Sequence, residues 1–367
     1  MVKKIRVGIL FGGKSAEHEV SLQSAKNVAE AIPKDKYEVV PIGIDKSGRW
    51  LLNDASNFLL QSAGSPMPQL KDSGKQVALI PESAGGLTYV GTGGGRAAAR
   101  GVDVVFPILH GPFGEDGTVQ GLLKLAGIPF VGAGVLGSAV GMDKDVTKRL
   151  LRDAGIPIGK FLTFKSSDKI IFAKVKKELG LPVFIKPANM GSSVGVSKAR
   201  NEKEFKTAVL DAFKYDNKII LEEFIKGREI KCAILGNDKL VASLPGEVIM
   251  KNKDDFYSYD AKYINEDGAV LKIPADLPRK TIKKVQGLAV KTFQTLSCEG
   301  LGRVDMFLKE NGEVLVNEIN TIPGFTSISM YPKLWEASGI SYPKLIDTLI
   351  QLALERFAKE AKLKTSK

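Results

Sequence analysis

The chain has 367 residues, of which 44% are hydrophobic and 26% charged, with 38 glycines and 17 prolines. This length predicts two or three domains of about 150 residues each, and the composition excludes a fibrous or disordered protein. No apolar run approaches the roughly 20 residues of a membrane-spanning helix, and the N-terminus enters the strand-like IRVGILF instead of a cleavable apolar segment, so we expect a cytoplasmic protein.

The chain holds few ligands for soft metals. Its cysteines are Cys232 and Cys298 and its histidines His18 and His110, so we expect neither a disulfide framework nor a zinc site. Any metal should be a hard cation held by carboxylates. The net charge of +12 favours anionic partners, but the basic residues are spread along the chain and do not interleave with aromatic residues. We therefore expect small anionic ligands as partners, and neither nucleic acid nor a membrane.

Residues 1–141 have the pattern of an α/β domain. Apolar runs alternate with segments of helical periodicity, which is typical of a doubly wound parallel sheet. Residues 46–100 hold short polar and glycine-rich pieces that predict hairpins or a flexible excursion. The expected strands lie at 5–11, 37–44 and 102–109, and the expected helices at about 21–32 and from Thr118.

Two further lobes are expected. Residues 142–226 predict a compact central lobe that begins with a helix, and residues 227–367 predict a C-terminal lobe dominated by an antiparallel sheet. The C-terminal lobe should also contain a long helix at about 279–297 and an amphipathic helix at about 342–361. The strand candidates lie at 181–187, 217–225, 229–235, 240–248, 302–308 and 313–319.

The glycine-rich segment 12–21 follows the first strand. Its backbone N–H groups and the start of the next helix could bind an anion, although it is not a dinucleotide-binding fingerprint. In the alternative interpretation, Ser21 simply caps the helix. Glu17 and Glu19 are unusual beside an anion-binding turn unless they hold a cationic group, such as an amine, or orient another side chain.

His110 ends an apolar strand and opens the loop HGPFGEDG. Open α/β sheets place ligand-binding residues at this position, and an ordinary boundary histidine is the alternative. Glu115 and Asp116 in the same loop could bind an ion, although capping the helix from Thr118 is the favoured role for Asp116.

Two segments of the central lobe suit a nucleotide. An apolar strand leads to Lys186 and then to the small-residue loop GSSVG, which could wrap phosphate oxygens; an ordinary hairpin is the alternative. Glu222 and Glu223 interrupt a later apolar strand, where they could accept hydrogen bonds from ribose hydroxyls. The alternative there is a solvated strand end.

The sharpest pattern lies in GRVDMFL and EVLVNEIN. Arg303 and Asp305 share one face of a strand, and Glu318 and Asn320 share one face of the next. If these strands pair, two carboxylates and an amide oxygen converge, which is a ligand set for Mg²⁺. Ordinary alternation on a half-buried sheet is disfavoured, because the acidic residues lack equal counter-charge.

Two loops complete the pattern. Residues 256–264 hold three tyrosines and Lys262, and indicate either a lid or a strand face. Residues 321–330 place Gly324 and several hydroxyls directly after the metal candidates.

These pieces, in this order, resemble the D-alanine–D-alanine ligases of the ATP-grasp superfamily over nearly the whole chain. The segments that carry the resemblance are GGKSAEHEVSL, LHGPFGEDGTVQG, MDK, KPANMGSSVG, YDAKY, GRVD and NEINTIPGFTS. The family forms a peptide bond between two D-alanines for bacterial cell-wall precursors, through a D-alanyl phosphate made from ATP. The resemblance implies a three-lobed α/β ATP-grasp fold that grips ATP between the second and third lobes. It also implies two Mg²⁺ ions per active site, or Mn²⁺ in their place, and a homodimer.

The resemblance further implies roles for single residues. Glu17 should meet the ammonium of the first D-alanine and form a hydrogen-bonded set with Ser192 and Tyr263, and His110 should lie near that substrate's carboxylate. A tyrosine at position 263 favours the dipeptide over a D-lactate ester. The second substrate's pocket should hold Ser329 and Met330.

Further positions match the ATP site and the reaction centre. Lys144 and Lys186 should contact ATP phosphates, Ser193 and its loop should cover them, and Lys262 should arrive from the lid. Arg303 and the amide of Gly324 should form the oxyanion site. The remaining positions are Glu222, Ile225 and Glu229 for adenine and ribose, and Asp305, Glu318 and Asn320 for magnesium.

Two other functions stay open on the residues alone. One is an ATP-grasp carboxylate–amine ligase that uses a different amino acid. The other is a non-catalytic nucleotide- or nucleic-acid-binding module that uses the basic charge. The carboxylates of GRVD and NEIN count against the second, because acids in a phosphate-binding site make sense only with a metal.

Overall fold

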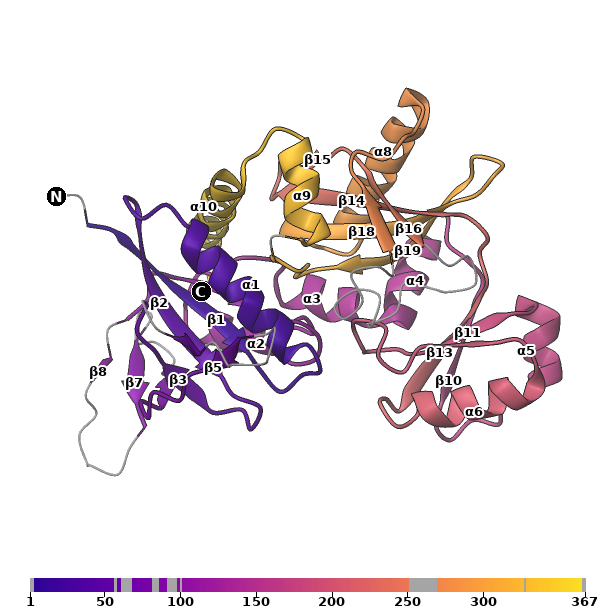
Figure 1. Cartoon of the computed structure of the whole chain (residues 1–367), viewed down its shortest axis with the longest axis horizontal. Helices are drawn as coiled ribbons and strands as arrows, with labels where there is room; N and C mark the ends of the chain where they lie inside the picture. Colours follow the sequence, from indigo (N-terminus) through magenta and orange to yellow (C-terminus); the bar gives the residue numbers. More distant parts are fainter. Residues whose placement is uncertain are drawn as a thin grey trace.

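The computed structural model contains three main sheets, each with its own helices (Figure 1). The N-terminal lobe lies on the left of Figure 1, the central lobe at the lower right and the C-terminal lobe above both. The structure describes residues 3–55, 58–60, 68–80, 86–90, 98–99, 101–250, 269–326 and 328–364.

The N-terminal sheet has the order β3-β2-β1-β9, in which β2, β1 and β9 are parallel and β3 is antiparallel to β2. Helices α1 and α10 pack on one face of this sheet and α2 packs on the other, as the doubly wound pattern predicts. The elements are β1 (Ile5–Gly12), α1 (His18–Ala31), β2 (Tyr37–Ile44), β3 (Trp50–Leu52), β9 (Val104–Ile108), α2 (Thr118–Leu125) and α10 (Tyr342–Glu360).

The start of α1 differs from the prediction. The helix begins at His18, and Ser21 lies inside it, so the alternative interpretation that Ser21 caps the helix is wrong. The Ser21 hydroxyl accepts a hydrogen bond from the Gly12 amide at 2.7 Å and donates one to the Ile108 carbonyl. Ser21 therefore ties the helix to the ends of β1 and β9, and this depends on contacts that are distant in sequence.

The predicted hairpins between residues 46 and 100 are present in the described part of that segment. One small sheet pairs β4 with β5, and another has the order β6-β7-β8. Their bounds are β4 (Leu59–Leu60), β5 (Gln69–Leu70), β6 (Val77–Leu79), β7 (Leu87–Tyr89) and β8 (Ala98–Ala99).

The central lobe is an antiparallel sheet of order β10-β13-β11-β12. Helices α5 and α6 cover one face, where they bury the apolar side chains of β11 and β13. The elements are β10 (Phe161–Lys165), α5 (Phe172–Leu179), β11 (Val183–Pro187), β12 (Ser197–Ala199), α6 (Glu202–Ala212) and β13 (Lys218–Glu223).

The C-terminal lobe has the predicted antiparallel sheet, with the order β17-β16-β14-β18-β19 and with β15 beside β14. Helix α8 packs on one face, and α9 packs on the other in a core that continues to the N-terminal sheet. The elements are β14 (Arg228–Gly236), β15 (Val241–Ala242), β16 (Gly246–Met250), β17 (Ala269–Lys272), α8 (Arg279–Thr295), β18 (Gly300–Leu308), β19 (Val314–Asn320) and α9 (Met330–Ala337).

Helices α3 (Val135–Met142) and α4 (Lys144–Asp153) connect the first sheet to the second. Helix α4 starts where predicted, because the Asp143 carboxylate caps it by accepting from the amides of Asp145 and Val146 at 3.1 Å. Both helices contact the C-terminal lobe, α3 at β19 and α4 at α8. Helix α3 is not predictable from local periodicity, because VLGSAVGM is short and holds two glycines.

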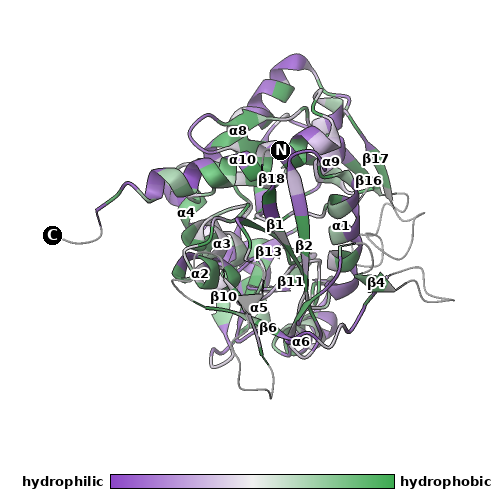
Figure 2. Cartoon of the chain, turned by 90° about the vertical axis from the view of Figure 1, so that its left-hand side faces the viewer, coloured by the Kyte–Doolittle hydropathy of each residue, from purple (hydrophilic) through white to green (hydrophobic). Residues whose placement is uncertain are grey.

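No helix in the described part of the chain is long and apolar enough to cross a membrane. Figure 2 shows that the last turns of α10 project from the body with mostly hydrophilic residues.

Arg356 of α10 provides a test of how the last helix is held. It is 7% exposed, and its guanidinium donates to the carbonyls of Gly132 and Phe130 and to the Glu299 carboxylate. Replacing Arg356 by Met leaves the buried carbonyls of Gly132 and Phe130 without this donor, so we expect the free energy of unfolding to fall by about 2–3 kcal/mol in urea denaturation.

The matched control is Lys362→Met, at an exposed position beyond the end of α10. The control should shift stability by no more than about 0.5 kcal/mol. Equal effects of the two substitutions would show that Arg356 does not anchor the helix.

Candidate active site

The loop before α1 meets a loop of the central lobe. The Ser192 hydroxyl donates a hydrogen bond to the buried Glu17 carboxylate, and a Cβ on Gly191 would lie 2.9 Å from the same carboxylate. The structure thus brings together two members of the predicted set Glu17, Ser192 and Tyr263. Glu19 takes no part in the contact between Glu17 and Ser192. Its carboxylate accepts a hydrogen bond from the Lys46 ammonium at 2.5 Å, and both side chains are exposed.

His110 and Glu115 hold one peptide of the loop after β19 from both sides. The His110 Nδ1–H donates to the Ile322 carbonyl at 3.0 Å, and the Glu115 carboxylate accepts from the Ile322 amide at 3.0 Å. Glu115 also accepts from the Gly111 amide at 2.8 Å. Because both of its oxygens bind backbone amides, the interpretation of Glu115 as an ion ligand loses support. Asp116 accepts from the Thr118 amide at 3.0 Å at the start of α2, as favoured.

Burial governs the protonation of these two residues. Desolvation lowers the pKa of His110, which favours its neutral form. Desolvation, reinforced by the nearby Glu17 carboxylate, raises the pKa of Glu115 to about 8, although the two amide hydrogen bonds oppose this shift.

The loop held by His110 and Glu115 carries three of the predicted residues. Gly324 lies against Ser329, whose hydroxyl would be 2.9 Å from a Cβ at that position, so a side chain here would displace it. The Ser329 hydroxyl accepts from the Thr326 amide at 3.0 Å, which stabilises the turn into α9. Met330 is buried at the first position of that helix.

The central lobe contributes a chain of three charged groups. Lys186 of β11 donates to the Glu222 carboxylate at 2.6 Å, and Lys148 of α4 lies 3.3 Å from the other oxygen of the same carboxylate. Burial alone would raise the pKa of Glu222, but the two ammonium groups lower it to about 2. Lys186 and Glu222 were predicted site residues, whereas Lys148 was not. The signal for Lys148 was its place four residues after Lys144, on the same side of the helix.

Lys144 lies beside the small-residue loop that follows β11. Its ammonium donates to the Met190 carbonyl at 2.6 Å. Within this loop Ser192 and Ser193 have φ of +48° and +62°. Non-glycine residues rarely adopt this left-handed conformation, so the backbone here turns tightly beside the lysine.

The exit of β13 holds the residues predicted to contact adenine. The Glu223 carboxylate accepts from the Lys160 amide at 2.7 Å, while the Ile225 side chain packs against Gly159, 2.8 Å from where a Cβ would lie. The Glu229 carboxylate, in the next strand, pairs with the Lys231 ammonium at 2.9 Å.

Strands β18 and β19 pair in the register that the alternation predicted. Arg303 lies opposite Asn320, and Asp305 lies opposite Glu318. The Arg303 guanidinium makes two hydrogen bonds to the Asp305 carboxylate, at 2.7 and 2.9 Å. The Asn320 amide group lies 3.3 Å from the same carboxylate. The predicted metal ligands therefore share one face of the sheet.

Asp305 does have counter-charge, contrary to the expectation from the sequence. Asp305 is paired with Lys231 at 2.9 Å as well as with Arg303. Burial would raise the pKa of the Asp305 carboxyl, but these two cations hold it well below its usual range. The sequence analysis missed Lys231, which lies opposite Asp305 on β14 and is 3% exposed.

The donor set fits a hard cation. It consists of two carboxylates and one amide, all oxygen donors on paired strands, which suits Mg²⁺ or Mn²⁺. Among the residues that the structure describes, no three His, Cys, Asp or Glu side chains form a metal-binding group, so phosphate or water oxygens would have to complete the coordination. Lys262 and Tyr263 lie outside the described residues.

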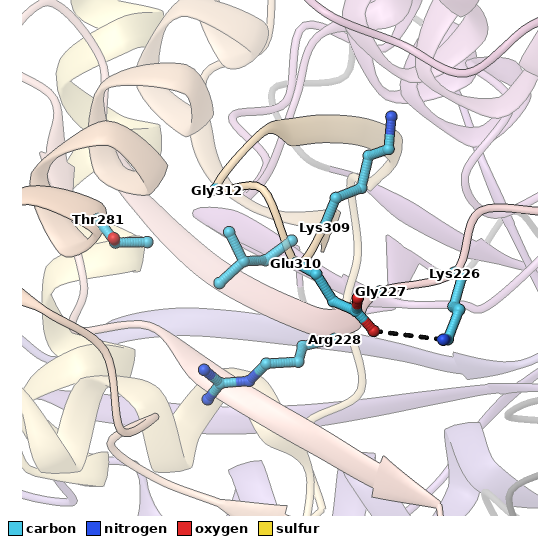
Figure 3. Close-up of a pocket in the computed structure, with 8 residues that line it drawn as sticks. Lys226, Gly227, Arg228, Thr281, Lys309, Glu310 and Gly312 are labelled. Carbon is cyan, nitrogen blue, oxygen red and sulfur yellow. Dashed lines mark ion pairs between the residues drawn. The ribbon is translucent and has the colours of Figure 1, made fainter.

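A surface depression of about 370 Å³ lies elsewhere, between the β13–β14 and β18–β19 connections. Figure 3 shows Lys226 and Glu310 facing one another there, with their charged groups 3.3 Å apart. It contains none of the predicted site residues, and its acidic and basic groups are largely exposed, so we do not assign the ligand site to it.

Comparison with known proteins gives matches along the chain. Residues 6–133 match the family described as D-ala D-ala ligase N-terminus, and residues 150–351 match D-ala D-ala ligase C-terminus. The D-alanine–D-alanine ligase of Shouchella clausii is 58% identical over 100% of this chain and 99% of its own length. D-alanine–D-alanine ligase A of Escherichia coli K12 is 53% identical over 100% of both chains.

Solved structures are also similar. The D-alanine–D-alanine ligase of Coxiella burnetii superposes with a TM-score of 0.84 at 37% identity, covering 98% of this chain and 97% of that chain. VanG D-Ala:D-Ser ligase of Enterococcus faecalis superposes with a TM-score of 0.82 at 37% identity, covering 96% of this chain and 100% of that chain. The Bacillus anthracis D-alanine–D-alanine ligase complexed with ATP superposes with a TM-score of 0.72 at 27% identity, covering 97% of this chain and 99% of that chain. These similarities confirm the predicted fold class.

The protonation of Glu115 predicts a pH dependence of stability. Its pKa in the folded chain, about 8, lies above the ordinary value of 4.5, so the folded state binds the proton more tightly than the unfolded state. The stabilisation is complete below pH 4.5 and is lost as the pH rises toward 8, at up to about 1.4 kcal/mol per pH unit.

Glu115→Gln removes this titration. Urea unfolding of both proteins at pH 5, 6, 7 and 8 should therefore show the stability of the wild type declining relative to that of the variant. Parallel pH profiles would contradict the assignment of a raised pKa to Glu115.

Proposed function

This chain belongs to the D-alanine–D-alanine ligase family, and we propose that the junction of its three lobes is the active site at which it joins two D-alanines. The enzyme forms D-alanyl-D-alanine for peptidoglycan synthesis in an ATP-dependent reaction. The observation that carries the site proposal is that Glu318 of β19 acts electrostatically on Lys148 of α4 and Lys186 of β11, favouring the charged form of each, so that the lysines lie near the proposed oxygen ligands.

The reaction that fits this site has two steps. A carboxylate oxygen of the first D-alanine attacks the γ-phosphorus of ATP, which forms D-alanyl phosphate and releases ADP. The amine of the second D-alanine then attacks the acyl carbon, and the tetrahedral intermediate expels phosphate to leave the dipeptide. Both steps concentrate negative charge on neighbouring oxygen atoms, so they need cationic groups in fixed positions.

Lys144 and Lys186 are the groups that we assign to the ATP phosphates. Their positions are fixed by the Met190 carbonyl and by the Glu222 carboxylate, respectively. The loop with Ser193 would cover the phosphates, and Ile225 and Glu229 would contact adenine and ribose. Both carboxylate oxygens of Glu222, the third residue expected there, lie against lysines, so we assign Glu222 to positioning Lys186 and not to contact with adenine or ribose.

Asp305, Glu318 and Asn320 are the residues that we assign to two Mg²⁺ ions, or to Mn²⁺ in their place. When bound, the metal would neutralise phosphate charge during transfer. Against the effect of burial, Arg303 and Lys231 lower the pKa of Asp305 and so favour its ionised form, which is the form that binds a metal.

Arg303 and the Gly324 amide would stabilise the tetrahedral oxyanion. Arg303 is held in place by its paired hydrogen bonds to Asp305, and the Gly324 loop is held at Ile322 by His110 and Glu115. Donors that are fixed before the reaction lose little energy to reorganisation when charge develops.

Glu17 would bind the ammonium of the first D-alanine, with Ser192 and Tyr263 closing the set. His110 would face that substrate's carboxylate, and Ser329 with Met330 would line the pocket of the second substrate. The apolar side chain of the buried Met330 suits contact with a methyl group.

We also propose that the enzyme is a homodimer. The apolar face of α1 is already buried within this chain, so it is not the interface. Leu125 of α2 and Leu136 of α3, on helices that contact one another, are 74% and 62% exposed and are better candidates. Light scattering of the purified protein would give the mass of one or of two chains.

The first functional test is phosphate release from ATP and Mg²⁺ with the products identified by mass. The substrates compared should be D-alanine, L-alanine, and D-alanine with D-lactate or D-serine. Turnover with D-alanine alone that yields the dipeptide is the expected result. ATP hydrolysis that requires another amino acid would overturn the assignment of D-alanine as the substrate. No ATP hydrolysis in any mixture would overturn the assignment as an ATP-dependent enzyme.

Substitutions at the reaction centre test the residue assignments. Arg303→Ala and Glu318→Gln should each reduce turnover about 100-fold or more with circular dichroism unchanged, because each removes a group that stabilises transition-state charge. The controls are Arg200→Ala and Glu310→Gln, at exposed positions of the same residue types. Rates like the wild type in both site variants would remove this region as the active site.

A further inference from the structure

Lys148 has no role in the reaction described so far, yet it is one of the most buried charged residues of the chain. It is 2% exposed, and it reaches the ATP side of the junction from α4. Its ammonium lies 3.3 Å from one oxygen of Glu222, while Lys186 contacts the other oxygen at 2.6 Å. Glu222 therefore lies between two lysines that come from different elements, α4 and β11.

The position of Lys148 is well defined by its helix. The Asp143 cap of α4 is paired with Lys218 at the start of β13, and Lys218 also lies 3.7 Å from Asp145. These contacts hold the first turns of α4 against the strand that carries Glu222. Lys148 thus approaches a carboxylate that is fixed relative to its own backbone.

The charges of the three groups explain why a second lysine is useful. Lys186 and Glu222 alone form a neutral pair, and a neutral pair attracts a polyphosphate weakly. Lys148 neutralises the Glu222 carboxylate, so the positive charge of Lys186 is not cancelled. The three groups together carry a net charge of +1. Glu318 also affects both lysines electrostatically, but we assign its charge to the metal.

A merely structural role fits poorly. A buried lysine loses its hydration, and replacing a buried ion pair by apolar residues is often neutral or stabilising. Burial lowers the pKa of Lys148, and Glu222 opposes that shift, so the ammonium depends on this single close carboxylate among the described contacts.

We propose that Lys148 is a positioning residue for ATP: it neutralises Glu222 and holds it where it orients Lys186, so that the Lys186 charge is available to the phosphates. This inference rests on the proposed function, because it takes Lys186 as a phosphate-binding group. It predicts that Lys148 contributes to the binding of phosphate groups and not to the binding of the nucleoside.

The test is equilibrium binding of ATP and of adenosine, with Mg²⁺, measured by calorimetry without amino acid. Lys148→Met should weaken ATP binding about tenfold or more and change adenosine binding less than about threefold. The double variant Lys148→Met/Glu222→Gln removes both charges and leaves Lys186 with its full charge, so it should recover most of the ATP affinity.

The control is Lys174→Met, at an exposed position of α5, which should bind both ligands like the wild type. Equal weakening of ATP and adenosine by Lys148→Met, or no weakening of either, would overturn the inference. If Lys148→Met does not fold, the double variant decides: ATP affinity near the wild type supports the inference, and ATP affinity at least tenfold weaker overturns it.

The binding measurements distinguish an error in the proposed function from an error in the proposed role of Lys148. If the wild type does not bind ATP, the proposed function is wrong. If the wild type binds ATP and the variants do not follow the pattern above, only the role of Lys148 is wrong.

Discussion

Buried carboxylates next to an anion-binding site must be neutralised, and the junction of the three lobes is organised by that requirement. Glu222 lies between Lys148 and Lys186, and Asp305 lies between Lys231 and Arg303. Each carboxylate orients its cations, and each cation makes the buried carboxylate tolerable. The same arrangement leaves groups that can bind phosphate, metal and a developing oxyanion within one region.

Polar contacts of this kind also connect the lobes. The apolar cores hold each sheet to its helices, and one core continues from the N-terminal sheet to α9 and the C-terminal sheet. The central lobe joins the N-terminal lobe through the hydrogen bond of Ser192 to Glu17, and it joins the C-terminal sheet through the Val316 amide, which donates to the Pro157 carbonyl at 2.8 Å. In our proposal, substrate recognition and lobe geometry therefore depend on some of the same side chains, since Glu17 and Ser192 serve both.

The features that the sequence predicted best are those that depend on local periodicity. Alternation along two strands placed Arg303, Asp305, Glu318 and Asn320 on one face, and the pairing of β18 with β19 has this register. Contacts between distant segments were not accessible in this way. Ser21 bonds the end of β9 instead of capping its helix, and Lys231 reaches Asp305 from a strand 74 residues away. The family resemblance supplied roles for single residues that alternation alone cannot give.

The most direct test of the site is a crystal structure with Mn²⁺ and a non-hydrolysable ATP analogue, using the anomalous signal of manganese. We predict manganese at roughly 2.0–2.2 Å from oxygens of Asp305, Glu318 and Asn320, with Lys144 and Lys186 on the phosphates of the same nucleotide. Manganese bound away from these three residues, or a nucleotide whose phosphates do not reach the two lysines, would contradict the assignment of the junction as the active site.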